Sequence, residues 1–409
     1  MSNQGALSHL RVLDLSRILA GPWASQVLGD LGAEIIKIER PEAGDDTRRW
    51  GPPYLKDSAG RDTDVASYFL CANRNKQSVA IDMAKPEGQA LIRDLAAKSD
   101  VLLENFKVGG LKQYGLDYES LKAVNPRLVY CSISGFGQSG PYANRPGYDF
   151  LIQGLGGLMS LSGRPEGEAG AGPMKVGVAL IDLLAGLYAC TAILAALAHR
   201  DRTGEGQHID ISLLDVGVAC LANQALNYCT TGISPVRLGN AHPSIVPYED
   251  FPTADGYMLL GIGNDGQFER FCAEAGRPEL ARDPRFATNA ERVRNRKTLI
   301  PLLRQITVTR ATAAWVAALE AKSVPCGPIN DLAGVFADPQ VRARELQTTV
   351  EHPTLGPVPQ VASPLRLSGS PVSYRRAPPL LGEHTESVLR EVLGLDADGI
   401  DALRTRGVL

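Results

Sequence analysis

The segment LRVLDLSRILAGPWASQVLGDLGAEIIKIER, residues 10–40, decides the fold, because it places a helical pattern between two short apolar runs. Residues 10–15 and 34–39 have the length and apolar content of strands, and the residues around 23–31 have the pattern of a helix. A strand, a helix and a strand in this order predict a parallel pair joined by a right-handed crossover. The opening of the chain therefore predicts an α/β sheet.

The same rhythm continues to residue 134 and predicts a doubly wound, Rossmann-like α/β domain. A helix begins at Pro86 and runs to about residue 98. A glycine-rich span at 154–172, an apolar helix at 176–198 and a strand at 207–212 follow. The additional strands are expected at residues 78–82, 100–106 and 127–134.

A second pattern begins after residue 218. Two short runs at 248–252 and 257–261 flank the turn sequence Ala-Asp-Gly and predict an antiparallel hairpin. We expect three divisions of the chain: a large domain at 1–218, a smaller α+β domain at 219–326, and a segment at 327–409 that returns to the large domain. Helices of the smaller domain are expected at 267–275, 290–306 and 311–321.

Composition excludes several classes of protein. With 42 Lys and Arg against 45 Asp and Glu, the net charge of −3 provides no field for nucleic acid or an anionic membrane. The seven cysteines contain no C-x-x-C pair and the six histidines have no metal spacing, so we expect neither a disulfide framework nor a metal site. The first ten residues lack the pattern of a secretion signal. We expect a cytoplasmic protein with no nucleic-acid or membrane partner.

The segment 176–198 is long and apolar enough to cross a bilayer, at about 20 residues. It carries one charge, Asp182, and a carboxylate in lipid costs roughly 2.5 to 3.5 kcal/mol. We therefore expect a helix buried in protein.

Asp182 has two compatible interpretations. It could accept the first backbone N–H groups of the helix that follows, as an N-cap residue does. It could instead be a catalytic carboxylate, because carboxylates are rarely buried without a partner or a task. A helix N-terminus would favour the ionised form that a nucleophile needs. Position alone leaves both open.

Polar loops follow several predicted strands. The block at 39–50 holds several arginines, and the segments at 73–76 and 104–106 occupy similar strand-end positions, where open α/β sheets bind ligands. The sequence GIGNDG at 261–266 matches G-x-G-x-x-G but lies in a hairpin context. It is a tight turn that opens a helix, or a mobile loop whose N–H groups face a negatively charged intermediate.

With these residues in view, the chain resembles the class III CoA transferases, the family of formyl-CoA transferase and carnitine CoA-transferase, to which α-methylacyl-CoA racemase is related. The likeness covers nearly the whole length and rests on many short fragments together. They are VLDLS at 12–16, AGP at 20–22, LGAEIIKIER at 31–40, NK at 75–76, ENF at 104–106, GYD at 147–149, TGEGQ at 203–207, CGP at 326–328 and PLLGEHT at 379–385.

This resemblance implies an enzyme that moves CoA between carboxylic acids, with Asp182 as the nucleophile that carries CoA as a thioester. It implies CoA as a substrate, no permanently bound cofactor, and a homodimer of two interlocked chains. The residues implied at the CoA site are Ile18, Ala20, Arg40, Asn75, Lys76, Asn105 and Lys112. Those implied at the border of the reaction centre are Tyr148, Asp149, Gly261, Gly263, Asn264, Gly266 and Gln267.

Two further inferences concern the reaction. The related racemases have a histidine where this chain has Tyr148, and a phenol with a pKa near 10 is a poor base near neutrality. This favours a transferase over an α-methylacyl-CoA epimerase, which is the alternative. Succinyl-CoA as donor with a short dicarboxylate or hydroxy-dicarboxylate as acceptor is the preferred pair. The candidates for holding the distal carboxylate are Arg48, Arg49 and Arg145.

Overall fold

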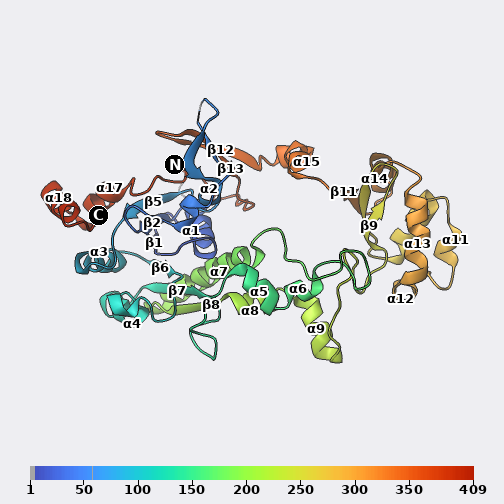
Figure 1. Cartoon of the computed structure of the whole chain (residues 1–409), viewed down its shortest axis with the longest axis horizontal. Coiled ribbons are helices and arrows are strands. Elements are labelled where there is room, and N and C mark those ends of the chain that lie inside the picture. Colours follow the sequence, from blue (N-terminus) through green and yellow to red (C-terminus); the bar gives the residue numbers. More distant parts are fainter. Residues whose placement is uncertain (1–4, 58) are drawn as a thin grey trace. The chain divides into compact units, whose positions relative to one another are not determined.

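The computed structural model describes residues 5–57 and 59–409, which form two compact units (Figure 1). Of the described residues, the larger unit comprises 5–57, 59–158, 176–232 and 340–409, and the smaller unit comprises 159–175 and 233–339. The chain thus enters the smaller unit twice, and it returns to the larger unit each time. The expected domain boundaries after residues 218 and 326 stay a prediction, because a compact unit is not by itself an independently folding domain.

The larger unit is built on a six-stranded sheet in the order β5-β2-β1-β6-β7-β8, in which every neighbouring pair is parallel. The order reverses between β1 and β6, as in doubly wound folds. The expected α/β class is confirmed. The strands are β1 (Arg11–Asp14), β2 (Glu34–Glu39), β5 (Lys76–Ala80), β6 (Val101–Glu104), β7 (Val129–Ser134) and β8 (His208–Ser212).

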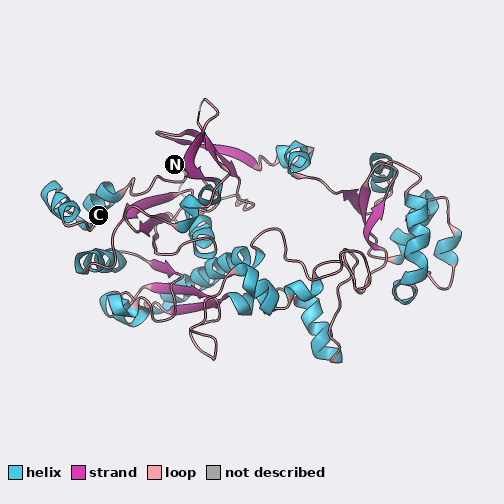
Figure 2. Cartoon of the chain, viewed as in Figure 1, coloured by secondary structure: helices cyan, strands magenta, loops and turns pink. Residues whose placement is uncertain are grey.

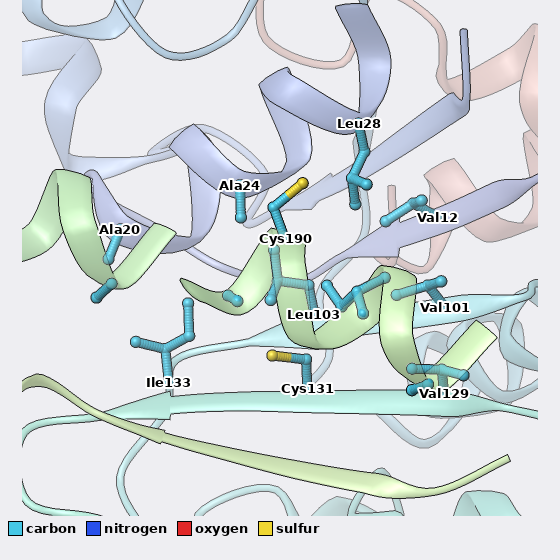
Figure 3. Packing of buried hydrophobic residues seen from close by; sticks show 14 of the residues in the cluster. Val12, Ala20, Ala24, Leu28, Val101, Leu103, Val129, Cys131, Ile133 and Cys190 are labelled. Atoms are coloured by element: carbon cyan, nitrogen blue, oxygen red, sulfur yellow. The ribbon is translucent and has the colours of Figure 1, made fainter. Parts of the chain in front are cut away.

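Helices cover both faces of this sheet because successive residues of each buried strand point to opposite sides. Val12 of β1 packs into a core with α1 (Ala20–Asp30) and α7 (Leu180–Thr203), which Figure 3 shows from close by. Its neighbour Leu13 packs into a second core on the other face. The helices on that face are α3 (Pro86–Ala97), α4 (Tyr118–Val124), α17 (Thr385–Leu393) and α18 (Ala397–Thr405).

α7 is the expected apolar helix, and within the described residues it alone has the length and composition of a membrane span. Core helices of soluble proteins pass the same test, and one face of α7 is fully buried, including Ala185, Ala189 and Ile193. Gly186 permits close packing on α1, since a Cβ there would lie 2.6 Å from the Ala20 carbonyl oxygen. The opposite face is exposed in the single chain.

Two short hairpins complete the larger unit, and the sequence patterns did not predict either of them. The pairs β3–β4 and β12–β13 share a small core that includes Leu55 and Val358. Their strands are β3 (Tyr54–Lys56), β4 (Asp62–Ala66), β12 (Gln347–His352) and β13 (Gly356–Val361). The short helices of this unit are η1 (Asp46–Arg49), α2 (Ser67–Leu70), η2 (Lys112–Tyr114), α5 (Asp149–Leu155), α8 (Leu213–Ala219) and α9 (Ala222–Thr231).

The smaller unit contains a three-stranded antiparallel sheet in the order β11-β10-β9 and a set of helices (Figure 2). The predicted hairpin is confirmed as β9 (Tyr248–Pro252) and β10 (Tyr257–Gly261), and β11 (Cys326–Pro328) pairs with β10. The expected helix at 290–306 is wrong in one respect, because Asn295 interrupts it. The helices are α10 (Asp265–Glu274), α11 (Glu279–Arg282), α12 (Asn289–Arg294), α13 (Arg296–Thr307) and α14 (Thr312–Glu320).

The short helices α6 (Leu158–Leu161), α15 (Leu332–Ala337) and α16 (Pro339–Ala343) lie at or near the points where the chain passes between the units.

Candidate active site

A cavity of about 840 Å³ opens at the carboxyl ends of β1, β2, β6 and β7. The loop after β1 contributes residues 17–20, and the loops after β2 and β6 contribute Arg40 and Asn105. Asp182, in the first turn of α7, lines the same space, which we call the Asp182 cavity. Its volume lies in the range of roughly 300 to 1,000 Å³ that is usual for ligand pockets.

The position of Asp182 excludes one of its two interpretations. α7 begins at Leu180, so Asp182 is the third residue of the helix and not its N-cap. Asp149 performs the capping role, because its Oδ1 accepts from the backbone N–H groups of Ile181 at 2.8 Å and Asp182 at 3.4 Å. The N-cap interpretation of Asp182 is wrong. Its side chain does not cap the helix, and the residue lines the cavity.

The electrostatic environment of Asp182 raises its pKa to about 7, first because burial disfavours the charged form and second because Asp149 adds negative charge. Within the described residues its side chain takes part in no hydrogen bond or ion pair. Perturbed carboxylates of this kind in a cleft are typical of functional sites. With a pKa near 7, the Asp182 side chain is partly protonated and partly ionised at neutral pH. The poorly solvated ionised form is a reactive nucleophile.

Asp149 connects this helix start to a second buried group. Gln153 of α5 donates from Nε2 to Asp149 Oδ2 at 2.6 Å, and its Oε1 accepts from the Val176 N–H at 2.9 Å. Tyr148, the residue before Asp149, lines the Asp182 cavity, whereas Asp149 itself does not. Asp149 therefore borders the site through the backbone of α7.

Of the residues expected at the CoA site, Ile18, Ala20, Arg40 and Asn105 line the Asp182 cavity. Asn75 and Lys76 do not. Both are buried and bonded to protein: Asn75 Nδ2 donates to Asp30 at 2.8 Å, and Lys76 pairs with Asp14 at 3.2 Å.

Lys112 lines a neighbouring cavity of about 200 Å³ and does not line the Asp182 cavity. The expected position of residues 73–76 after a strand is wrong, because this segment leads into β5 and lies at its amino end, away from the carboxyl ends where the cavity opens.

The three candidate arginines differ in whether they are available to a substrate carboxylate. Arg48 is occupied, because it donates twice to Glu39 and stacks on Phe69 at 3.7 Å from the ring centroid. Arg49 and Arg145 both line the Asp182 cavity. Arg145 stacks on Tyr142 at 4.4 Å, and no carboxylate within the described residues forms an ion pair with it. Arg49 and Arg145 therefore remain as candidates to receive a substrate carboxylate.

Two aromatic residues near Asp182 were not singled out by the sequence. Trp50 lines the cavity and meets Tyr68 edge to face at 5.1 Å between ring centroids. Burial and then the charge of Asp182 raise the pKa of Tyr68 to about 12, which keeps its phenol protonated. Tyr68 belongs to the four-residue helix α2, and no motif or periodicity distinguishes it.

The glycine sequence at 261–266 lies in the smaller unit and forms the N-terminus of α10. Asn264 is the N-cap, and its Oδ1 accepts from the Gln267 N–H at 2.9 Å. Gln267 Oε1 accepts from the Gly263 N–H at 2.7 Å. The expected turn that opens a helix is confirmed, and a function for Gly261, Gly263, Asn264, Gly266 and Gln267 stays a prediction.

Comparison with known proteins gives the family. The model of CoA-transferase family III matches residues 7–385. The chain belongs to this family. It is 50% identical over 386 residues to the succinate–glutarate CoA-transferase of Agrobacterium fabrum, covering 94% of this chain and 95% of that protein. It is 44% identical over 409 residues to the human succinyl-CoA:glutarate CoA-transferase, covering 100% and 91%.

Among solved structures, a CAIB/BAIF family protein from Brucella suis superposes with a TM-score of 0.83 at 48% identity. The match covers 95% of this chain and 100% of that chain. The expected CoA-transferase activity is thereby confirmed, and these relatives favour it over the epimerase alternative. A CoA-transferase uses CoA thioesters as substrates. Within the described residues, no group of three or more His, Cys, Asp or Glu side chains could hold a metal ion.

Proposed function

We propose that this CoA-transferase moves CoA from succinyl-CoA to a short dicarboxylate such as glutarate, with Asp182 as the covalent carrier. The observation that carries the proposal is the unpaired carboxylate of Asp182 on a cavity at the carboxyl ends of the sheet. The relatives at 44% and 50% identity are named for succinate and glutarate, which supports this substrate class.

In the first half of the reaction, an Asp182 carboxylate oxygen attacks the thioester carbonyl carbon of the donor. The carbon–sulfur bond breaks, and CoA leaves as a thiolate from a mixed anhydride. The thiolate then attacks the aspartyl carbonyl carbon. The anhydride carbon–oxygen bond breaks, the donor acid leaves as a carboxylate, and an aspartyl-CoA thioester remains.

The acceptor carboxylate reverses these steps and leaves as the new thioester. No proton or external reductant is needed, because each step exchanges one carboxylate or thiolate for another. Water is the competing nucleophile, so both intermediates require a site from which water is excluded. We propose that the glycine loop at residues 261–267 provides this cover in the assembled enzyme.

Trapping the intermediate tests the proposal. The enzyme is incubated with succinyl-CoA and treated with hydroxylamine or borohydride, and the modified peptide is sequenced by mass spectrometry. The modification should lie on Asp182, and Asp182→Asn should show none. A label on another carboxylate, or turnover without any label, contradicts the assignment.

We propose Arg145 as the residue that holds the distal carboxylate of the dicarboxylate substrate. Arg145 lines the Asp182 cavity, and its guanidinium stacks on the rings of Tyr142 and Phe136. A charge-assisted hydrogen bond of this kind contributes about 1.5 to 3 kcal/mol. Arg145→Gln should therefore raise the KM for glutarate by about tenfold or more. A monocarboxylate acceptor of similar length provides the control, because its KM should change little.

We also propose a cytoplasmic homodimer of two interlocked chains. Large apolar side chains are exposed on the single chain, such as Phe150 on α5, Tyr188 on α7 and Leu226 on α9. Extended exposed apolar surface of this kind is typical of an interface. Light scattering should give twice the mass of 43.7 kDa, and the melting temperature should fall on dilution. A stable monomer at micromolar concentration would contradict the proposal.

A further inference from the structure

The loop between β1 and α1 is held by side-chain hydrogen bonds to the backbone of three consecutive residues, 16–18. Asp14 Oδ1 accepts from the Ser16 N–H at 2.9 Å, and the Lys37 ammonium donates to the Ser16 carbonyl at 2.7 Å. Asn105 accepts from the Arg17 N–H at 2.9 Å and donates to the Arg17 carbonyl at 2.7 Å. The loop is thus fixed from β2 and from the segment after β6.

The next residue, Ile18, has a φ of +73°. This left-handed conformation is unfavourable for a β-branched residue, and such strain persists only where the surroundings determine it. The Ile18 N–H lies 3.2 and 3.3 Å from the two carboxylate oxygens of Asp45. Residues 17–20 all line the Asp182 cavity, so the strained residue lies where the ligand must bind.

Lys37 and Asp45 form a single buried unit. Their ammonium and carboxylate are 2.9 Å apart, and both side chains are fully buried. Thr47 orients Asp45 through its backbone N–H at 3.0 Å and its hydroxyl at 2.7 Å. One member of the pair therefore bonds the backbone of Ser16, and the other bonds the backbone of Ile18. The pair spans the turn that Ile18 makes.

We propose that the Lys37–Asp45 pair is a positioning element for CoA: it holds Ile18 in its left-handed conformation and thereby shapes the cavity wall at residues 17–20. Neither side chain needs to touch the reacting atoms. This inference rests on the proposed use of the Asp182 cavity as the CoA site. A pair that only stabilises the sheet would affect folding, but it would have no specific effect on CoA affinity.

The double variant Lys37→Met/Asp45→Asn removes both charges together, so no buried charge is left unpaired. Without the Lys37–Asp45 ion pair, Ile18 should relax toward negative φ, and the dissociation constant for CoA should rise by about tenfold or more. Equilibrium titration with CoA measures this without any covalent step. The matched control is Arg200→Met/Asp100→Asn, an ion pair outside the cavity with a buried arginine, which should lower the melting temperature and leave CoA affinity unchanged.

A rescue experiment separates positioning from general stability. Glycine adopts positive φ without strain, so adding Ile18→Gly to the Lys37→Met/Asp45→Asn variant should restore much of the CoA affinity. Adding Ile18→Val keeps the β-branched side chain and should restore none. Equal effects of Gly and Val, or unchanged affinity in the double variant, would overturn the inference.

A milder variant covers the case in which the double variant does not fold. Thr47→Val removes the hydroxyl that orients Asp45 without unpairing a buried charge, and it should weaken CoA binding by about two- to tenfold. No change in this variant contradicts the inference. Failure of the proposed function is distinguishable, because it would appear as the absence of an Asp182 label in the unaltered enzyme while CoA still binds.

Discussion

Asp45 and Asp182 line the same cavity, yet their surroundings act on them in opposite directions. Burial acts to raise the pKa of Asp45, but the Lys37 charge and the hydrogen bonds from Thr47 outweigh it and lower the pKa to about 2. Burial and the charge of Asp149 raise the pKa of Asp182 to about 7. Asp45, which helps to shape the cavity, forms an ion pair with Lys37. Asp182, the proposed nucleophile, forms no ion pair within the described residues.

The largest expected effect follows from replacing the unpaired carboxylate. Asp182→Asn keeps the shape of the side chain but removes the attacking oxygen, so kcat for CoA transfer should fall by about 10³-fold or more. The control is Asp201→Asn at the other end of α7, which should leave kcat unchanged. Retention of more than a tenth of the activity in Asp182→Asn would exclude the covalent role.

Removing the partner of Asp45 should lower the free energy of unfolding. Lys37→Met leaves the Asp45 charge buried without its partner, and removing one member of a buried pair costs about 3 to 5 kcal/mol of unfolding free energy. Denaturant titration measures this. Lys56→Met breaks an exposed pair with Asp62 and should change the unfolding free energy by at most about 1 kcal/mol. Similar losses in both variants would show that Asp45 is not the buried partner described.

The pH dependence of the reaction should follow Asp182. Only the ionised carboxylate attacks, so kcat/KM should rise about tenfold per pH unit below pH 7 and become constant above it. Asp149→Asn removes the neighbouring charge while retaining an oxygen that can cap α7. The midpoint should therefore move to lower pH in this variant. A profile that is flat from pH 5 to 8 would assign the rate to another step.

The fold was predictable where strand and helix patterns are long and regular. Residues 10–15 and 34–39 alternate between two buried faces, and the structure places them as the adjacent interior strands β1 and β2. The hairpin β3–β4 was missed because β3 has only three residues, and the hairpin β12–β13 was missed because β12 is largely polar and β13 contains two prolines. Asn295 divides a predicted helix at a position where no proline or glycine marks a break.

The site was predictable where residues follow strands, because parallel strands bring their carboxyl ends together. Arg40 and Asn105 lie on the cavity for this reason. The same reasoning failed for Asn75 and Lys76, because residues 73–76 lead into β5 and so lie at the amino end of that strand and not at its carboxyl end. Tyr68 could not be found, because its proximity to Asp182 depends on tertiary packing alone.

The smallest expected effect tests whether Asp182 destabilises the fold. Its folded-state pKa lies above the value of 3.8 in an unfolded chain, so between these values the folded state binds more protons and stability falls as pH rises. Asp182→Asn does not titrate and should escape this loss. Its melting temperature relative to the unaltered enzyme should therefore increase from pH 4 to pH 7, by on the order of a few degrees, and stay constant above pH 7.

Asp45 contributes in the opposite sense, since its stabilisation is present above pH 4 and is lost as pH falls toward 2. Subtracting the two melting curves removes the contribution of Asp45, which both proteins share. A difference that stays constant from pH 4 to pH 7 would mean that the pKa of Asp182 is not raised, as expected if the carboxylate has a cation partner in the assembled enzyme.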